Sequence, residues 1–333
     1  MSRQILVRSQ MALGCLLLCA VASSAENLRL YVGNSRGDDV SVVDLTSMKV
    51  IGDIKLGERI HGVAVQPDGK RLFVTVESDH TLRIVDTKTG DSEPVKVSGR
   101  PNQVAVTPDG KYVVVPIRDG DKVDIVDVGK KEVVKSLPIK EPHNALSTGS
   151  NRYVFVSSMG SHEINIIDLQ KMDYSAVIPA GGRPRPYVVS PDGKIMFVAV
   201  ADLHGFDIVD IPEKKVLERV EMPAEHTPHP LRYETADTLT HGLALTPDGS
   251  ELWVTSLLDD CVYIYDVKAK KIVGKVPTGG GPNWLAFTPD GKLLCVSNTD
   301  SDDVSVIDVK RRTELTRIKV GKVPKRLVIA VAP

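Results

Sequence analysis

Histidines are the side chains of this sequence with the clearest capacity for chemistry. The chain has eight of them, and three, His61, His143 and His241, each stand near the start of a short apolar run that leads into a turn. Neutral imidazole is a common metal ligand and a general base near neutral pH. Three imidazoles with one open position would suit zinc or copper. Whether they act together depends on the elements that carry them.

An internal repeat defines those elements. Pro-Asp-Gly occurs five times, beginning at residues 67, 108, 191, 247 and 289, which gives intervals of 41, 83, 56 and 42 residues. The longest interval contains a degenerate copy, Gly149-Ser150-Asn151, and the 56-residue interval contains an insertion. A period near 42 residues is typical of β-propeller blades.

Each repeat has the pattern of four short strands. In one copy, strands are expected over 62–66, 72–76, 81–85 and 94–97, with turn residues between them. An aspartate before the last turn recurs seven times, and we assign it the structural role of bonding its own turn backbone. The seven copies are Asp44, Asp86, Asp127, Asp168, Asp210, Asp266 and Asp308. Seven copies predict seven blades.

The ends of the repeat array complement each other. Residues 29–34 read as a second strand that lacks a first strand before it, and residues 326–331 read as an extra first strand. Pairing of the two removes the open edges of a linear array. We therefore predict an all-β fold over residues 26–333, a seven-bladed β-propeller of four-stranded antiparallel blades, closed by pairing of the N- and C-terminal strands.

The first 25 residues have a different composition. Arg3 and Arg8 precede an apolar stretch at 11–22, and Ser23-Ser24-Ala25 follows it. This pattern predicts a signal peptide cleaved near Ala25 and a periplasmic or secreted mature protein. Lipidation of Cys15 is the alternative, although Ala12-Leu13-Gly14 is a poor approach to such a site.

The composition of the mature chain excludes several classes. Hydrophobic residues make up 42% and aromatic residues 5% of the whole sequence, and no later run is long enough to span a bilayer. Without Arg3 and Arg8, 40 basic residues stand against 43 acidic ones, a formal net charge of −3, which predicts no polyanion partner. Cys261 and Cys295 lie in expected strands and are interpreted as buried thiols.

One face of the predicted ring collects the histidines. In a propeller the connections from the fourth strand to the next first strand share a face with the turns between the second and third strands. The position where the chain enters the central channel is polar in every repeat. It reads His61, Asn102, His143, Arg185, His241, Asn283 and Lys325. We predict that this central ring binds the ligand.

The remaining histidines belong to the same face. A turn position reads Asp38, His80, Asp121, His162, His204, Asp260 and Asp302, and we interpret the histidines there as structural or surface residues because histidine tolerates turn conformations. The insertion between residues 222 and 240 carries the rest. Its predicted specificity residues are His226, His229, Arg232 and Tyr233.

The repeat resembles a known family. Tyr31-Val32-Gly33-Asn34, Phe73-Val74-Thr75, Trp253-Val254-Thr255 and Cys295-Val296-Ser297-Asn298 are each followed by an aspartate-rich turn. These motifs resemble the YVTN β-propeller family over essentially the whole mature chain. That resemblance implies the propeller fold but no single activity, since similar proteins include YncE-like DNA-binding proteins, accessory proteins of quinone-cofactor-dependent catabolism, and propellers that hold haem d1.

Two kinds of cofactor are compatible with the ring. The first is a transition metal, zinc or copper, held by His61, His143 and His241, although their places in alternate blades separate them. The second is a tetrapyrrole with one histidine as axial ligand. Its carboxylates would meet Arg59, Arg100, Arg183, Arg185 or Lys325.

The predictions about binding partners and about catalysis also concern this face. The insertion favours a protein partner or a small-molecule ligand on this face. The predicted anion contacts are Arg59, Arg100 and Arg183. The absence of a continuous basic stripe argues against nucleic acid. Single-stranded DNA binding of the YncE-like kind and an enzyme, a propeller lactonase or lyase with a ring histidine as general base, are the alternatives. The ring lacks the paired carboxylates that a hard ion such as magnesium would need. We predict a ligand- or partner-binding accessory protein, and the family resemblance implies that it serves a redox or cofactor-linked pathway.

Overall fold

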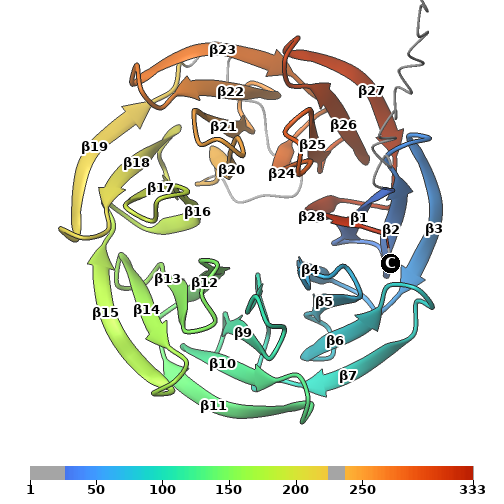
Figure 1. Cartoon of the computed structure of the whole chain (residues 1–333), viewed down its shortest axis with the longest axis vertical. Helices are drawn as coiled ribbons and strands as arrows, with labels where there is room; N and C mark the ends of the chain where they lie inside the picture. Colours follow the sequence, from blue (N-terminus) through green and yellow to red (C-terminus); the bar gives the residue numbers. More distant parts are fainter. Residues whose placement is uncertain (1–26, 224–236, 333) are drawn as a thin grey trace, which may run out of the picture.

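Seven four-stranded sheets surround one central axis (Figure 1). The computed structural model describes residues 27–223 and 237–332, and within these ranges the secondary structure is twenty-eight strands. No helix in the described ranges has the length and apolarity that crossing a membrane requires. The predicted all-β, seven-bladed propeller is confirmed.

Each blade is antiparallel and is numbered here by its position in the chain, with its innermost strand given first. Blade 1 contains β28 (Pro324–Val331), β1 (Leu28–Asn34), β2 (Asp39–Asp44) and β3 (Lys49–Lys55). Blade 2 contains β4 (Ile60–Val65), β5 (Arg71–Val76), β6 (Thr81–Asp86) and β7 (Ser92–Lys96). Blade 3 contains β8 (Ala105–Val106), β9 (Tyr112–Ile117), β10 (Lys122–Asp127) and β11 (Glu132–Pro138).

The other four blades repeat this order. Blade 4 contains β12 (Pro142–Ser147), β13 (Tyr153–Ser158), β14 (Glu163–Asp168) and β15 (Asp173–Pro179). Blade 5 contains β16 (Pro184–Val189), β17 (Ile195–Val200), β18 (Gly205–Asp210) and β19 (Lys215–Glu221). Blade 6 contains β20 (Thr240–Leu245), β21 (Glu251–Ser256), β22 (Cys261–Asp266) and β23 (Lys271–Pro277). Blade 7 contains β24 (Pro282–Phe287), β25 (Leu293–Asn298), β26 (Asp303–Asp308) and β27 (Thr313–Lys319).

The ring closes as the sequence predicts. Strand β28 pairs antiparallel with β1, from Leu28 opposite Val331 to Asn34 opposite Pro324. Leu327 of β28 is fully buried in a cluster with Leu30 and Val32 of β1. Segments from the two ends of the chain therefore share one sheet and one core.

The core lies between neighbouring blades. In one cluster, Val40 and Val42 of blade 1 pack with Val74 and Val76 of blade 2. The second and third strands of each blade are buried along nearly their whole length, whereas an outermost strand such as β3 is almost entirely exposed. Because each blade is packed on both sides, the inner strands form a rigid frame for the loops above them.

The seven recurrent aspartates have the predicted structural role. Each carboxylate accepts a hydrogen bond from a backbone N–H two or three residues further on, at 2.6–3.0 Å. The donors, in chain order, are Ser47, Lys88, Lys130, Gln170, Glu213, Ala269 and Arg311. These bonds hold the turn between the third and fourth strand of every blade.

Several turns on the predicted functional face use a left-handed backbone. His80 and His162 have φ angles of 55° and 59°, which supports the structural interpretation of these histidines. Arg59 (φ 63°), Glu141 (44°) and Val323 (55°) have this conformation at the place where the chain enters an inner strand. Gly281 (65°) does so at the equivalent place in blade 7, where glycine adopts it without strain.

Some predictions concern residues that the structure does not describe. The signal peptide 1–25, with Cys15, falls in the undescribed N-terminal range, and His226, His229, Arg232 and Tyr233 fall in the undescribed range 224–236. The two cysteines of the described ranges, Cys261 and Cys295, are buried and form no disulfide bond. Burial raises the pKa of Cys295 to about 12.

Candidate functional site

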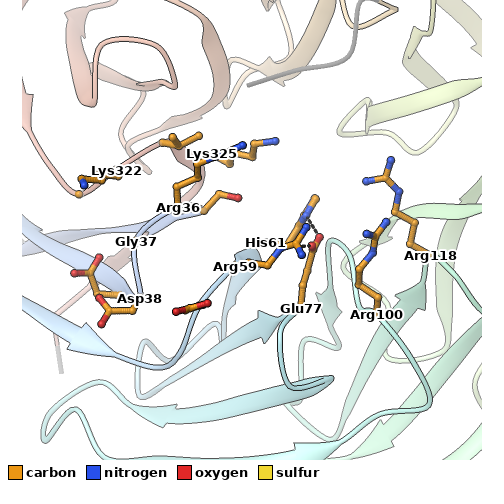
Figure 2. A pocket seen from close by; sticks show the side chains of 15 residues that line it. Arg36, Gly37, Asp38, Arg59, His61, Glu77, Arg100, Arg118, Lys322 and Lys325 are labelled. Carbon is orange, nitrogen blue, oxygen red and sulfur yellow. Dashed lines mark hydrogen bonds and ion pairs between the residues drawn. The ribbon is translucent and has the colours of Figure 1, made fainter. Parts of the chain in front are cut away.

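A cavity of about 930 Å³ opens over blades 1, 2 and 3, on the face that the sequence predicts. Figure 2 shows its charged side chains arranged around His61. The cations are Arg36, Arg59, Arg100, Arg118, Lys322 and Lys325, and the carboxylates are Asp38, Asp39, Glu58 and Glu77. We call this cavity the cation pocket.

His61 and Glu77 form a hydrogen-bonded pair in the wall of the cation pocket. His61 is the second residue of β4, and Glu77 directly follows β5, the neighbouring strand in the same blade. Nδ1 of His61 lies 2.6 Å from Oε1 of Glu77, and both side chains are about nine-tenths buried. Glu77 thus fixes the orientation of the imidazole ring (Figure 2).

The imidazole of this pair is neutral at physiological pH. Burial is the largest influence and lowers the pKa of His61 to about 4, in spite of the opposing effect of the Glu77 carboxylate. Burial alone would raise the pKa of Glu77, but the hydrogen bond from His61 and the nearby cations bring it down to about 2. A neutral ring that donates from Nδ1 to an ionised Glu77 keeps the lone pair of Nε2 available.

Nearby cations of the protein partly neutralise the carboxylates of the cation pocket. Lys55 donates to Asp38 at 2.8 Å and to Asp39 at 2.7 Å. Arg59 lies 3.7 Å from Glu77, with 63% of its side chain exposed. Among the described residues that line the cation pocket, six cations stand against four carboxylates, and two of these carboxylates are also bonded to Lys55. The formal charge of this described lining is therefore positive.

Only two members of the predicted central ring line this pocket, namely His61 and Lys325. Asn102 is fully buried, and its side-chain oxygen accepts from the Gln103 backbone N–H at 2.8 Å. The cation pocket therefore contains two of the seven positions of the predicted central ring, and the prediction that all seven bind one ligand remains a prediction. The other members are covered because large side chains fill the channel axis.

Those side chains form an axial collar, which we define as His143, His241, Asn283, Trp284 and Arg326. The rings of His143 and His241 have their centroids 6.3 Å apart, and His241 lies 6.0 Å from the Trp284 ring. The Arg326 guanidinium sits 4.3 Å above Trp284 and donates to Oδ1 of Asn283 at 3.0 Å. Burial lowers the pKa values of His143 and His241 well below the ordinary range, and the nearby arginines add to this effect.

Two of the predicted anion-binding arginines are engaged by a carboxylate. Arg185 donates to Asp237 at 2.7 Å, and Arg183 contacts the same carboxylate at 3.3 Å. Arg183 also lies 3.9 Å from Glu141. Of the three predicted anion contacts, the structure therefore brings Arg59 and Arg100 into the cation pocket, whereas Arg183 lies beside Asp237.

The three-histidine metal site is not assembled within the described residues. Over 27–223 and 237–332, no group of three or more His, Cys, Asp or Glu side chains is placed to hold a metal ion. His143 and His241 face each other in the collar, but His61 is turned toward Glu77. The expected set of His61, His143 and His241 is corrected accordingly.

Comparison with known proteins identifies the family. A family model described as a seven-bladed lactonase β-propeller matches residues 138–330. The chain belongs to this lactonase family. A search of curated proteins found no significant match.

Solved structures share the lactonase-family fold at low identity. Hydrazine synthase from Kuenenia stuttgartiensis is 23% identical with a TM-score of 0.72, over 84% of this chain and 92% of that one. A candidate 6-phosphogluconolactonase from Bacteroides fragilis is 16% identical with a TM-score of 0.74, over 92% and 99%. The dihydro-haem d1 dehydrogenase NirN is 14% identical with a TM-score of 0.67, over 87% and 63%.

The third turn histidine of this lactonase-family chain differs from the other two. In blade 5 the left-handed residue is Asp202 instead of His204, and the His204 side chain is largely buried. Its Nε2 lies 2.8 Å from the Ser256 hydroxyl and 3.7 Å from Asp259. Both short distances involve the same ring nitrogen, so the contacts found do not form a relay through the imidazole.

Sequence reasoning missed Glu77 and several cations of the pocket. Ser35, Glu77 and Arg118, all of which line the pocket, occupy equivalent positions directly after the second strand of blades 1, 2 and 3. Comparison of that position across the repeats is the signal that would have found them. Arg36 and Lys322 lie in polar turns and carry no comparable signal.

Proposed function

We propose that this lactonase-family propeller binds a small polyanionic molecule in the cation pocket. The observation that carries the proposal is the excess of guanidinium and ammonium groups around a cavity of about 930 Å³. Cavities of this size accommodate small molecules and cofactors. Arginine pairs well with carboxylate and phosphate groups, because its planar fork donates two parallel hydrogen bonds.

The His61–Glu77 pair adds a directional contact to this charge. A neutral imidazole held at Nδ1 presents Nε2 as an acceptor for a ligand hydroxyl or as a ligand for a metal centre. The pocket would therefore also suit a carboxylated tetrapyrrole: His61 would bind its metal, and Arg100 and Lys322 would pair with its carboxylates. Bound iron would supply redox chemistry.

Citrate is a suitable probe of polyanion binding. We expect Arg100→Gln to weaken citrate binding about tenfold or more, because a hydrogen bond to a charged group contributes roughly 1.5–3 kcal/mol. Affinity should also fall with rising salt. Isothermal titration calorimetry measures both effects. Arg71→Gln is the matched control, since Arg71 lies at the opposite end of β5 from Glu77. Equal affinities of wild type and Arg100→Gln would exclude the cation pocket.

Hemin is a suitable probe of tetrapyrrole binding in the cation pocket. Coordination by His61 should shift the Soret band, and His61→Ala should abolish that shift while citrate binding persists through the cations. A shift that persists in His61→Ala would rule out this residue as the axial ligand.

Lactone hydrolysis is a second candidate, favoured by the His61–Glu77 geometry together with the family. Nε2 of His61 would take a proton from a water that attacks the lactone carbonyl carbon. The ring C–O bond then breaks, and the imidazolium returns that proton to the departing alkoxide, which yields a hydroxy acid. Glu77 would stabilise the transient imidazolium, and Arg59 or Arg100 the oxyanion.

The hydrolase candidate makes a distinct prediction. If δ-gluconolactone or its 6-phosphorylated form is a substrate, His61→Ala should lower kcat about 10²–10⁴-fold, the usual contribution of a general base. Glu77→Gln should lower kcat less, and Arg100→Gln should act mainly on the phosphorylated lactone. A pH-stat assay measures the acid released. Release at the buffer rate by wild type would exclude this activity and leave polyanion binding untouched.

We further propose a periplasmic or secreted location and an accessory role in a redox or cofactor-linked pathway. The leader pattern of residues 1–25 supports the location. The fold shared with hydrazine synthase and with a haem d1 dehydrogenase supports the role by analogy of fold.

A further inference from the structure

The same backbone hydrogen bond recurs in all seven blades, on the face that carries the cation pocket. The residue that follows the second strand donates its N–H, at 2.9–3.0 Å, to the carbonyl oxygen of the residue at the entrance to the innermost strand. From blade 1 to blade 7, the pairs, acceptor first, are Val323 and Ser35, Arg59 and Glu77, Arg100 and Arg118, Glu141 and Met159, Arg183 and Ala201, Leu239 and Leu257, and Gly281 and Thr299. The bond places the two residues side by side in every blade.

Blade 3 differs from the others in the charge of this pair. Among these seven pairs, all of described residues, only Arg100 and Arg118 combine two cations. The same positions of blade 2 carry Arg59 and Glu77, whose charged groups lie 3.7 Å apart. The described carboxylates that line the cation pocket all come from outside blade 3. Neighbouring guanidinium groups repel each other, and an anion bound between them would be attracted by both.

Blade 1 supplies a second set of cations, one position further along the same loops. The N–H of Arg36 donates to the carbonyl oxygen of Lys322 at 3.2 Å. The equivalent bond in blade 7 joins Asp300 to Gly280 at 2.9 Å, so that pair contains no cation. Lys325 of β28 lines the pocket beside this pair. We call Arg100 and Arg118 the blade 3 cations, and Arg36, Lys322 and Lys325 the blade 1 cations.

The two sets lie on opposite sides of the His61–Glu77 pair. Figure 2 shows the blade 3 cations on one side of this pair and the blade 1 cations on the other. The arrangement follows from the ring, because blade 2, which carries His61 and Glu77, lies between blades 1 and 3 (Figure 1). A ligand that reaches both sets must therefore extend across blade 2.

We propose that the ligand of the cation pocket is an elongated dianion, with one anionic group at the blade 3 cations and the other at the blade 1 cations. This inference rests on the proposed binding of a polyanion and specifies the shape of that molecule. Two linked anionic groups bind more tightly than one only where their separation lets both engage at once. The backbone bonds hold both loops before binding, which reduces the ordering that binding requires.

Rigid dicarboxylate isomers test the separation of the anionic groups at constant charge. Terephthalate carries its carboxylates at opposite ends of the ring, whereas phthalate carries them on neighbouring carbons. Naphthalene-2,6-dicarboxylate and its 2,3-isomer are a longer pair of the same kind. In calorimetry on the full-length protein, the elongated isomer of at least one pair should bind about tenfold or more tightly than its compact isomer. Equal affinities within both pairs would overturn the inference.

Variants at each set of cations test whether both ends are held. Arg118→Ser introduces the residue that blade 1 has at this position, and Lys322→Gln removes the other charge; both side chains are exposed, so the fold should persist. Each variant should lower the affinity for the elongated isomer to about that for the compact one, whereas the control Arg71→Gln should change neither. Equal losses for both isomers would show that net charge alone acts and would overturn the inference.

Citrate separates failure of this inference from failure of the proposed function. If citrate binds but the isomers do not differ, the cation pocket remains a polyanion site and the elongated ligand is excluded. If neither citrate nor any dicarboxylate binds, the proposed function fails, and this inference fails with it.

Discussion

A chain that ends at Lys325 is expected to lose its cooperative unfolding transition. This truncation removes most of β28, the innermost strand of blade 1, and leaves β1 as an open edge facing the channel. It also removes the buried side chains of Arg326, Leu327 and Ala330. Deleting a buried Leu side chain alone costs about 2–5 kcal/mol, and a domain of this kind has a total stability of only about 5–15 kcal/mol.

Thermal and urea denaturation followed by circular dichroism measure this effect. A chain that ends at Val331 is the matched control, because it keeps all of β28 and should melt near the wild-type temperature. An unchanged transition in the Lys325-terminated chain would refute closure of the ring by β28.

Acidification from pH 7.5 to 5 should destabilise the protein through its buried histidines. The folded-state pKa of His61 is about 4, below the ordinary value of 6.5, so in this range the unfolded chain binds a proton that the folded chain does not. Stability therefore rises with pH between about 4 and 6.5. His61 alone should account for about 2 kcal/mol at pH 5, and His143 and His241 act in the same direction.

Urea denaturation at pH 7.5 and pH 5 tests this prediction. Replacement of His61, His143 and His241 by Asn should flatten the pH dependence, because Asn does not titrate and already occupies the equivalent position in blades 3 and 7 as Asn102 and Asn283. His80→Asn is the control, since His80 lies in an outer turn. The same loss of stability on acidification in the triple variant as in wild type would show that other groups are responsible. Glu77 does not obscure the result, because its lowered pKa matters only below about pH 4.5.

The fold could be predicted from the sequence because the same turn and strand signals recur in all seven repeats. Each aspartate such as Asp168 marks one turn, and the unmatched strands at residues 29–34 and 326–331 specify the closure. Strand bounds shift by one or two residues, as in β7, which begins at Ser92 instead of residue 94. Strand ends depend on pairing with neighbours, which local composition does not encode.

The site was less predictable, because it depends on side chains of different sizes meeting at the axis. The sequence correctly predicts polar residues at the start of each inner strand. It does not show that Trp284 and Arg326, at the next position in blades 7 and 1, stack together and cover His241. Glu77 was missed because a polar residue after a strand is expected in any exposed turn.

The left-handed backbone at Arg59 means that a substitution which stabilises the fold would also change the charge of the cation pocket. Glycine, as found at the equivalent place in blade 7, would relax the turn and stabilise the folded ring. It would also delete a guanidinium from the cation pocket. Substitution of Arg59 by glycine is therefore expected to raise thermal stability and to weaken the anion binding that we propose for the cation pocket, and the reverse substitution is expected to reverse both effects.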